Sequence, residues 1–336
     1  MIKEAIEKAI ILQNFSEQEM SEIMEEIMEG KATPAQIGAL LTALRIKGEA
    51  IAELTGAARA MRRHAIFIDA ASNNILDTCG TGGDKSNTFN ISTTVAFVAA
   101  GGGLTVAKHG NRSVSSKCGS ADLLEELGVN IQADPEILEQ CIREIGIGFL
   151  FAPKLHGAMK YAGQVRREIG IRTIFNMLGP LTNPAGATCQ VLGVYAAGLT
   201  EMFASVLKNL GTKKALVVHG ADGLDEITLR GETRVTELSA GQIKTYNLNP
   251  RTFFDKTYSP DDFRGGDPKE NARITKAILA GEKGAPRDIV LINAAAALLA
   301  GETVSNLTQG IKRAEEIIDS GEAAKKLKQL IELSND

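Results

Sequence analysis

The chain has 336 residues, with 37 basic and 41 acidic side chains and a net charge of −4 at pH 7. This balance argues against a nucleic-acid binder, because such proteins obtain most of their affinity from a basic excess. Aromatic residues make up 4% of the chain and tryptophan is absent, which also disfavours a base-stacking platform.

The length predicts two domains, and residues 1–70 are expected to form the first as a small all-helical unit. Ser16 and Thr33 each precede a Glu or Gln by three residues, which is the capping-box pattern of a helix start. Gly30 and Gly48 are expected to end two of these helices.

The N-terminus lacks the apolar stretch of a signal peptide, the apolar run 289–300 is too short to span a bilayer, and the four cysteines are scattered. A cytoplasmic protein without a membrane partner is therefore expected.

Residues 71–336 are expected to form a larger α/β domain with a mostly parallel central sheet, because short apolar runs alternate with helical patterns. The expected strands are 75–76, 104–107, 129–131, 147–151, 190–195 and 215–219. The expected C-terminal helices are 268–280, 287–300, 304–319 and 321–333, after a looser connection over 246–266. Residues 155–185 are ambiguous and are expected to line the domain boundary, with about 160–185 adding helix to the first domain.

The segment from Asp77 to Thr94 carries the strongest chemical signal. It follows an expected strand, contains Gly80, Gly82 and Gly83, and opens a helix near Ile91. Backbone N–H groups of such a loop, with the positive end of a helix, favour a phosphate. It fits neither the G-x-x-x-x-G-K-[ST] nor the G-x-G-x-x-G nucleotide pattern. The alternative is a strand-to-helix turn that simply needs glycine.

A second loop, Lys108 to Ser120, follows the next expected strand and is rich in Lys, Arg and Ser. These side chains can surround a polyphosphate, although a solvated basic loop would look the same. Ser120 fits either a ligand contact or a helix N-cap.

The adjacent carboxylates Asp225 and Glu226, again after an expected strand, can bind Mg²⁺, although such pairs are more often solvated surface. His156 is ambiguous between a ligand contact and a structural role. Either Arg166 or Arg167 could bind a substrate carboxylate. The sequence contains no G-x-S-x-G or H-E-x-x-H motif and no recognisable nucleophile set, which favours a reaction driven by positioning and charge stabilisation.

Five collinear motifs resemble the anthranilate phosphoribosyltransferase family, whose fold is related to the nucleoside phosphorylases. They are GTGGD (80–84), NIST (90–93), KHGNRSVSSKCGSADLLEELG (108–128), RTIFNMLGPLTNP (172–184) and HGADGLDE (219–226). The resemblance covers the whole chain. It departs at Gly157, where the family usually has Pro after the histidine.

The resemblance implies transfer of the phosphoribosyl group of phosphoribosyl pyrophosphate to the amine of anthranilate, with release of pyrophosphate, in tryptophan biosynthesis. It implies one or two Mg²⁺ ions held by Ser92, Asp225 and Glu226. It also implies anthranilate contacts from Gly80, His109, Asn111, His156 and Arg166. The implied donor-binding residues are Gly80, Gly83, Asp84, Thr88, Asn90, Ile91, Ser92, Thr93, Lys108, His109, Gly110, Asn111, Arg112, Ser113, Val114, Ser115, Ser116 and Ser120.

The same resemblance implies a homodimer joined through the helical domain. Two alternatives are a pyrimidine-nucleoside phosphorylase, which has less need of the paired carboxylates, and a nucleic-acid-binding relative of the fold, which the acidic balance disfavours.

Overall fold

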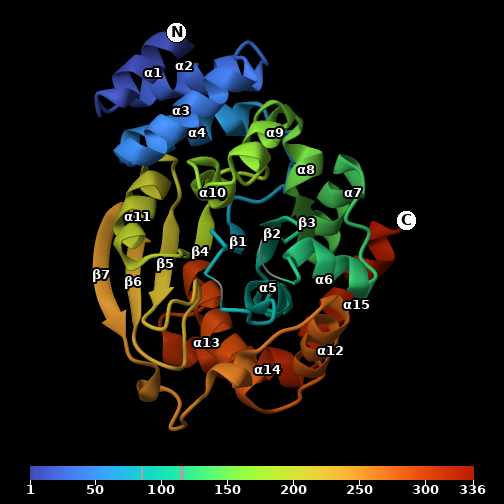
Figure 1. Ribbon diagram of the computed structural model, residues 1–336. Coiled ribbons are helices and arrows are strands. Elements are labelled where there is room, and N and C mark those ends of the chain that lie inside the picture. Colours follow the sequence, from blue (N-terminus) through green and yellow to red (C-terminus); the bar gives the residue numbers. More distant parts are fainter. Residues whose placement is uncertain (85, 114–116) are drawn as a thin grey trace.

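The computed structural model describes residues 1–84, 86–113 and 117–336, and its chain runs from a helical bundle into a sheet covered by helices (Figure 1). The bundle begins with α1 (Ile2–Ile10), α2 (Glu17–Met28), α3 (Pro34–Lys47) and α4 (Ile51–Arg63). The predicted capping boxes at Ser16 and Thr33 are both confirmed. Gly30 and Gly48 follow α2 and α3 at positive φ, as expected of helix-ending glycines.

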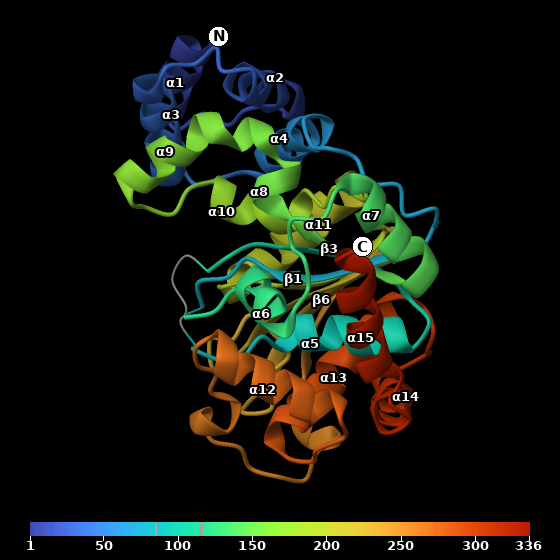
Figure 2. The same cartoon turned by 90° about the vertical axis from the view of Figure 1, so that its right-hand side faces the viewer.

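A later helix, α9 (Lys160–Ile169), joins this bundle and packs against α2 and α3 (Figure 2). The apolar core of the bundle continues into the sheet. It includes Leu41 of α3, Phe175 of α10 (Phe175–Leu178) and Phe203 of α11 (Thr200–Asn209), and it reaches Val217 on one face of the sheet. One apolar core therefore extends from the bundle through α10 and α11 to this face of the sheet.

The sheet has the strand order β3-β2-β1-β4-β5-β6-β7. Its strands are β1 (Ile75–Gly80), β2 (Thr105–Gly110), β3 (Ile147–Phe151), β4 (Cys189–Gly193), β5 (Lys214–Gly220), β6 (Thr233–Ser239) and β7 (Gln242–Leu248). The first five are parallel, whereas β6 and β7 pair antiparallel. The carboxyl ends of β1 and β4 lie side by side where the chain order reverses, which is where ligands bind in open α/β sheets.

Two features of the predicted sheet are wrong. Residues 129–131 form no strand, because the Val129 N–H bonds the Leu124 carbonyl in the turn that closes a helix. Val129 and Ile131 are buried, so their apolar character reflects packing and not strand pairing. The β6–β7 hairpin was not predicted, and β7 takes the first residues of the expected 246–266 connection.

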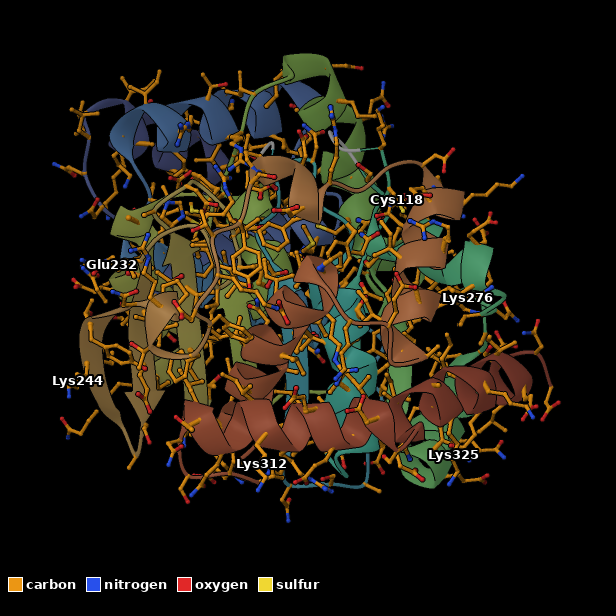
Figure 3. The ribbon with its side chains drawn as sticks, turned by 90° about the horizontal axis from the view of Figure 1, so that it is seen from below. Cys118, Glu232, Lys244, Lys276, Lys312 and Lys325 are labelled. Carbon is orange, nitrogen blue, oxygen red and sulfur yellow. The ribbon has the colours of Figure 1, made fainter. Side chains whose placement is uncertain are left out.

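The remaining helices cover both faces of the sheet. They are α5 (Ile91–Gly101), α6 (Ser120–Leu127), α7 (Pro135–Gln140), α8 (Ala152–Leu155), α12 (Pro268–Leu279), α13 (Ala285–Ala300), α14 (Leu307–Asp319) and α15 (Glu322–Ser334). The four predicted C-terminal helices are confirmed with small shifts of their ends. Helices α14 and α15 pack against α13 and α5, and Lys312 and Lys325 lie on their exposed side (Figure 3). Among the described residues, no helix is long and apolar enough to cross a bilayer.

Candidate functional site

The predicted glycine loop leaves the carboxyl end of β1 and is fastened to β4. Gly80 is the last residue of β1, and the Thr81 N–H donates to the Gly193 carbonyl at 2.9 Å. The Tyr195 N–H in turn donates to Thr81 Oγ1 at 3.1 Å. Gly82 and Gly83 both have positive φ, of 64° and 75°, which a side chain would strain. The backbone of the loop is thus fixed against the neighbouring strand.

Helix α5 begins immediately after this loop, with Asn90 at its N-cap and Ile91, Ser92 and Thr93 in its first turn. Asn90 Nδ2 donates to the Cys118 carbonyl at 3.2 Å, which ties the helix start to the second predicted loop. Thr93 Oγ1 is buried without a hydrogen-bond partner among the described residues. The N-terminal end of this helix carries partial positive charge. It therefore offers an anion both charge and polar groups.

Lys108, His109 and Gly110 were expected in a loop, but they are the last residues of β2. Lys108 is buried at 3% exposure, and its ammonium donates to the Thr78 carbonyl. Burial lowers the pKa of Lys108, while the nearby Asp77 carboxylate raises it. The Lys108 ammonium is therefore held at the carboxyl end of the parallel strands and does not extend into solvent.

The second loop begins at Asn111 and folds back on α6. The helix N-cap is Gly119, so the predicted N-cap role of Ser120 is wrong. Ser120 Oγ instead accepts from the Asn111 N–H at 3.2 Å and donates to the Asn111 carbonyl at 3.3 Å. Arg112 is paired with Asp122 and Glu125, and the Ser113 N–H donates to Asp122 at 3.0 Å. Val114, Ser115 and Ser116 lie outside the described residues, as does Lys85 of the glycine loop.

Asp225 and Glu226 lie against both the glycine loop and α5. Asp225 Oδ2 accepts from the Gly82 N–H at 3.0 Å, and a Cβ at Gly80 would lie 2.6 Å from the same oxygen. Burial, reinforced by the Asp84 carboxylate, raises the pKa of Asp225. Burial and the Asp225 charge raise the pKa of Glu226, whereas Lys108 and a hydrogen bond from the Ser92 N–H lower it. The pair is therefore not a solvated surface pair.

The donor set at this position fits a divalent cation. Burial and the Asp84 carboxylate raise the pKa of both side chains, and Asp225 further raises that of Glu226, so the site lacks sufficient countercharge. Mg²⁺ prefers carboxylate and other oxygen ligands. The described residues contain no group of three or more His, Cys, Asp or Glu side chains that could hold a metal ion by themselves.

The two site histidines lie together beneath the turn that follows α10. The rings of His109 and His156 have centroids 5.1 Å apart, and His109 Nδ1 donates to the Gly179 carbonyl at 3.1 Å. Burial and the neighbouring ring lower the pKa of His109 to about 3, and burial lowers the pKa of His156 to about 4. Both rings are therefore neutral at physiological pH. Their Nε2 atoms are buried without a hydrogen-bond partner among the described residues.

Arg166 and Arg167 differ in their surroundings on α9. The Arg166 guanidinium lies over the Phe175 ring at 5.2 Å, and burial lowers its pKa. Arg167 is exposed. Within the described ranges no carboxylate pairs with Arg166. A partly desolvated guanidinium that no carboxylate of the described residues neutralises is suited to a carboxylate ligand.

Sequence reasoning gave no role to Arg172, Tyr195, Asn183 or Asp77. Arg172 Nη2 donates to the Gly82 carbonyl at 2.8 Å, and its guanidinium lies over the Tyr195 ring. Asn183 Nδ2 donates to the buried Asp77 carboxylate at 2.8 Å, and Asp77 also accepts from the His109 N–H at 3.1 Å. Arg172 and Asn183 lie inside the motif RTIFNMLGPLTNP (172–184). Their position in that motif was the sequence feature that could have pointed to a role at the site.

Family models match nearly all of the chain. The helical bundle domain of a glycosyl transferase family matches residues 3–65, and the a/b domain of the same family matches residues 72–324. An anthranilate phosphoribosyltransferase of Syntrophobacter fumaroxidans is 57% identical over 336 residues, which is 100% of both chains. One of Acetivibrio thermocellus is 56% identical over 100% of this chain and 97% of its own.

This chain belongs to the anthranilate phosphoribosyltransferase family.

Solved structures of anthranilate phosphoribosyltransferases have the same fold. That of Thermus thermophilus superposes with a TM-score of 0.93 at 42% identity, covering 99% of each chain. That of Saccharomyces cerevisiae, in complex with PRPP and Mg, gives 0.91 at 30% identity, covering 99% of this chain and 98% of its own. These full-length matches favour neither the pyrimidine-nucleoside phosphorylase nor the nucleic-acid-binding alternative.

Proposed function

We propose that this chain transfers the phosphoribosyl group of phosphoribosyl pyrophosphate to the amine of anthranilate and releases pyrophosphate, as a step of tryptophan biosynthesis. The observation that carries the proposal is the meeting of the glycine loop, the start of α5 and the Asp225–Glu226 pair at the carboxyl ends of β1 and β4. That group of features suits a metal-bound polyphosphate. The full-length relatives carry the same activity in their names.

The donor is held by backbone and side chains around this point. Gly80, Gly83 and Asp84 supply the loop, and the α5 turn supplies its positive end. The β2 end and the following loop complete the set. The proposed donor-binding residues are Gly80, Gly83, Asp84, Thr88, Asn90 to Thr93, Lys108 to Ser116 and Ser120, of which Val114 to Ser116 lie outside the described residues.

Ser92, Asp225 and Glu226 are the proposed ligands of Mg²⁺. Bound there, the ion would neutralise negative charge on the pyrophosphate leaving group. The carboxylates are suited to this role because burial and repulsion from neighbouring carboxylates, Asp84 among them, already penalise their ionisation without a cation.

Anthranilate is proposed to lie against Gly80, Asn111, Arg166, His109 and His156. Arg166 holds the carboxylate with its planar guanidinium and so directs the amine at C1 of the ribose. The neutral rings of His109 and His156 present acceptor nitrogens. They carry no positive charge that would repel the positive charge developing on the ribose of the donor. In the reaction the C1–O bond to pyrophosphate breaks, the N–C1 bond forms, and the amine loses one proton. No side chain serves as a nucleophile.

A homodimer is proposed through an apolar groove of about 630 Å³ between α1, α3 and α9. Ile10 and Ile46 line it and are 63% and 75% exposed, and Ile11 and Leu12 beside it are similarly exposed. Apolar patches of this kind on a folded chain mark association surfaces. A second copy of the chain is the proposed occupant of this groove.

The proposed location of the protein is the cytoplasm.

The experiment that tests the proposed activity follows the loss of anthranilate fluorescence with phosphoribosyl pyrophosphate and Mg²⁺. Loss of fluorescence that requires all three components supports it. Absence of signal at micromolar enzyme, with phosphorolysis of uridine instead, would refute it.

A further inference from the structure

Arg172 connects the acceptor side of the site with the glycine loop. It lies in the link between α9, which carries Arg166, and α10. Its Nη2 donates to the Gly82 carbonyl at 2.8 Å, although the two residues are 90 positions apart in the sequence. The side chain therefore crosses from the helical segment to the donor loop.

Tyr195 holds this guanidinium from the other side. The Arg172 Cζ lies 3.9 Å from the centroid of the Tyr195 ring, which is a close cation–π contact. The Tyr195 N–H donates to Thr81 Oγ1. The loop is thus fastened to one residue twice, once through Thr81 and once through the stacked Arg172.

Gly83 is shaped for this contact. A Cβ at Gly83 would overlap Nη2 of Arg172, and its φ of 75° already disfavours a side chain. Within the described ranges, Arg172 has no carboxylate partner, and its Nη1 is buried without a hydrogen-bond partner. The contacts of this guanidinium with the Gly82 carbonyl and the Tyr195 ring therefore place its charge at the loop.

The bond to Gly82 fixes the peptide that joins Gly82 to Gly83. In a trans peptide the C=O and N–H point in opposite directions, so the Gly83 N–H is directed away from Arg172. The N–H groups of Thr81 and Gly82 already donate to Gly193 and Asp225. The Gly83 N–H has no acceptor among the described residues. A charged donor on the Gly82 carbonyl polarises this peptide and makes that N–H a stronger donor.

We propose that Arg172 is a positioning residue for the phosphoribosyl donor, which orients and polarises the Gly82–Gly83 peptide toward a phosphate oxygen. This inference rests on the proposed function, because it assigns the loop to the donor. Arg172 acts through the peptide and does not itself contact the reacting atoms.

The test compares steady-state kinetics of Arg172→Ala, Arg172→Lys and Arg167→Ala with the unaltered chain, after thermal unfolding has shown that each variant is folded. Arg172→Ala should raise the KM for phosphoribosyl pyrophosphate roughly tenfold or more and the KM for anthranilate less than about twofold. Arg172→Lys should give a donor KM between those of Arg172→Ala and the unaltered chain. An ammonium keeps the charge but lacks the planar group that stacks on Tyr195 and donates paired hydrogen bonds. Arg167→Ala removes the same charge from an exposed neighbour and should change neither KM.

Added guanidinium ion should lower the donor KM of Arg172→Ala, and the same concentration of sodium chloride should not. Equal increases in both KM values, an unchanged donor KM, or no recovery with guanidinium would each overturn the role of Arg172. The unaltered chain in the same assay reports on the proposed function alone. If the unaltered chain transfers the group and Arg172→Ala has unchanged KM values, only this inference is refuted. If the unaltered chain shows no transfer, the proposed function itself is refuted.

Discussion

His109 and His156 lie with their ring centroids 5.1 Å apart, and each is 6% exposed. His109 comes from the end of β2 and His156 follows α8, so two distant segments bring two titratable rings into one buried position. Burial is the main reason that both pKa values fall, because an imidazolium loses its hydration there.

This pair predicts that the fold loses stability in acid. The folded pKa values lie near 3 and 4, below the ordinary 6.5, so the unfolded chain binds more protons between these limits. The stability that each neutral ring contributes is complete above pH 6.5 and falls as the pH drops below it. At pH 5 each histidine should cost about 2 kcal/mol relative to pH 7. Urea unfolding of His109→Asn/His156→Asn at both pH values should show a clearly smaller loss than the unaltered chain, and an identical loss would contradict the account.

Arg166 predicts a loss confined to the acceptor. Because its guanidinium is partly buried over Phe175 without a carboxylate partner, Arg166→Ala should raise the KM for anthranilate at least about tenfold. The KM for phosphoribosyl pyrophosphate should stay nearly unchanged. Arg167→Ala on the same helix is the control. Initial rates with each substrate varied in turn decide the matter, and equal effects on both substrates would reject the carboxylate role.

Glu226 predicts opposite effects on stability and activity. Its pKa is raised, so its ionisation at pH 8 destabilises the metal-free fold. Glu226→Gln should therefore raise the unfolding temperature without Mg²⁺ by roughly 1 to 2 °C and raise the Mg²⁺ concentration needed for half-maximal rate. Glu232→Gln, at an exposed position that accepts a bond from Asn247, is the control. Differential scanning calorimetry and a Mg²⁺ titration measure both effects, and a lower unfolding temperature for Glu226→Gln would contradict the prediction.

Gly193 predicts sensitivity of the site to one methyl group. A Cβ at this position would overlap the Asp225 backbone carbonyl, so Gly193→Ala must displace the proposed metal-binding pair. We expect a loss of about 1 to 3 kcal/mol in the free energy of unfolding, as for other overpacked sites, and a large fall in kcat. Gly198→Ala, where a Cβ meets no atom within 4 Å, should change neither. A stable and fully active Gly193→Ala would show that this part of the site is not rigid.

The exposed groove predicts a dimer that one charge can separate. Ile46→Glu places a carboxylate in the groove between α1, α3 and α9, where desolvation would oppose association. Sedimentation equilibrium should give a species of about 35.7 kDa for this variant and a larger one for the unaltered chain. Ile243→Glu, on exposed β7, should leave the association unchanged. A monomeric unaltered chain would refute the proposed dimer.

The fold class, the helical start and the C-terminal helices were predictable from the sequence, because capping residues and apolar spacing are local signals. The β6–β7 hairpin was missed because only β6 alternates clearly between buried and less buried residues, while β7 is largely exposed. Residues 129–131 were misread because a buried turn and a short strand have the same apolar composition. The domain boundary near residue 70, with helix from about 160–185 contributing to the first domain, stays a prediction.

The chemistry of the site was predictable where it follows from residue type. Glycines, a helix start and paired carboxylates indicated a metal-bound phosphate. The bond of Ser120 to Asn111 and the closure of Arg112 onto α6 were not predictable, since both depend on how the chain folds back after β2. Arg172 was missed for the same reason, because its partners Gly82 and Tyr195 lie far away in the sequence.

The most direct test of the central claim is the stoichiometry of the reaction. With anthranilate, phosphoribosyl pyrophosphate and Mg²⁺, the account predicts one pyrophosphate released for each anthranilate consumed, and a product whose mass is anthranilate plus a phosphoribosyl group. Pyrophosphate released without consumption of anthranilate, or phosphorolysis of a nucleoside in its place, would contradict it.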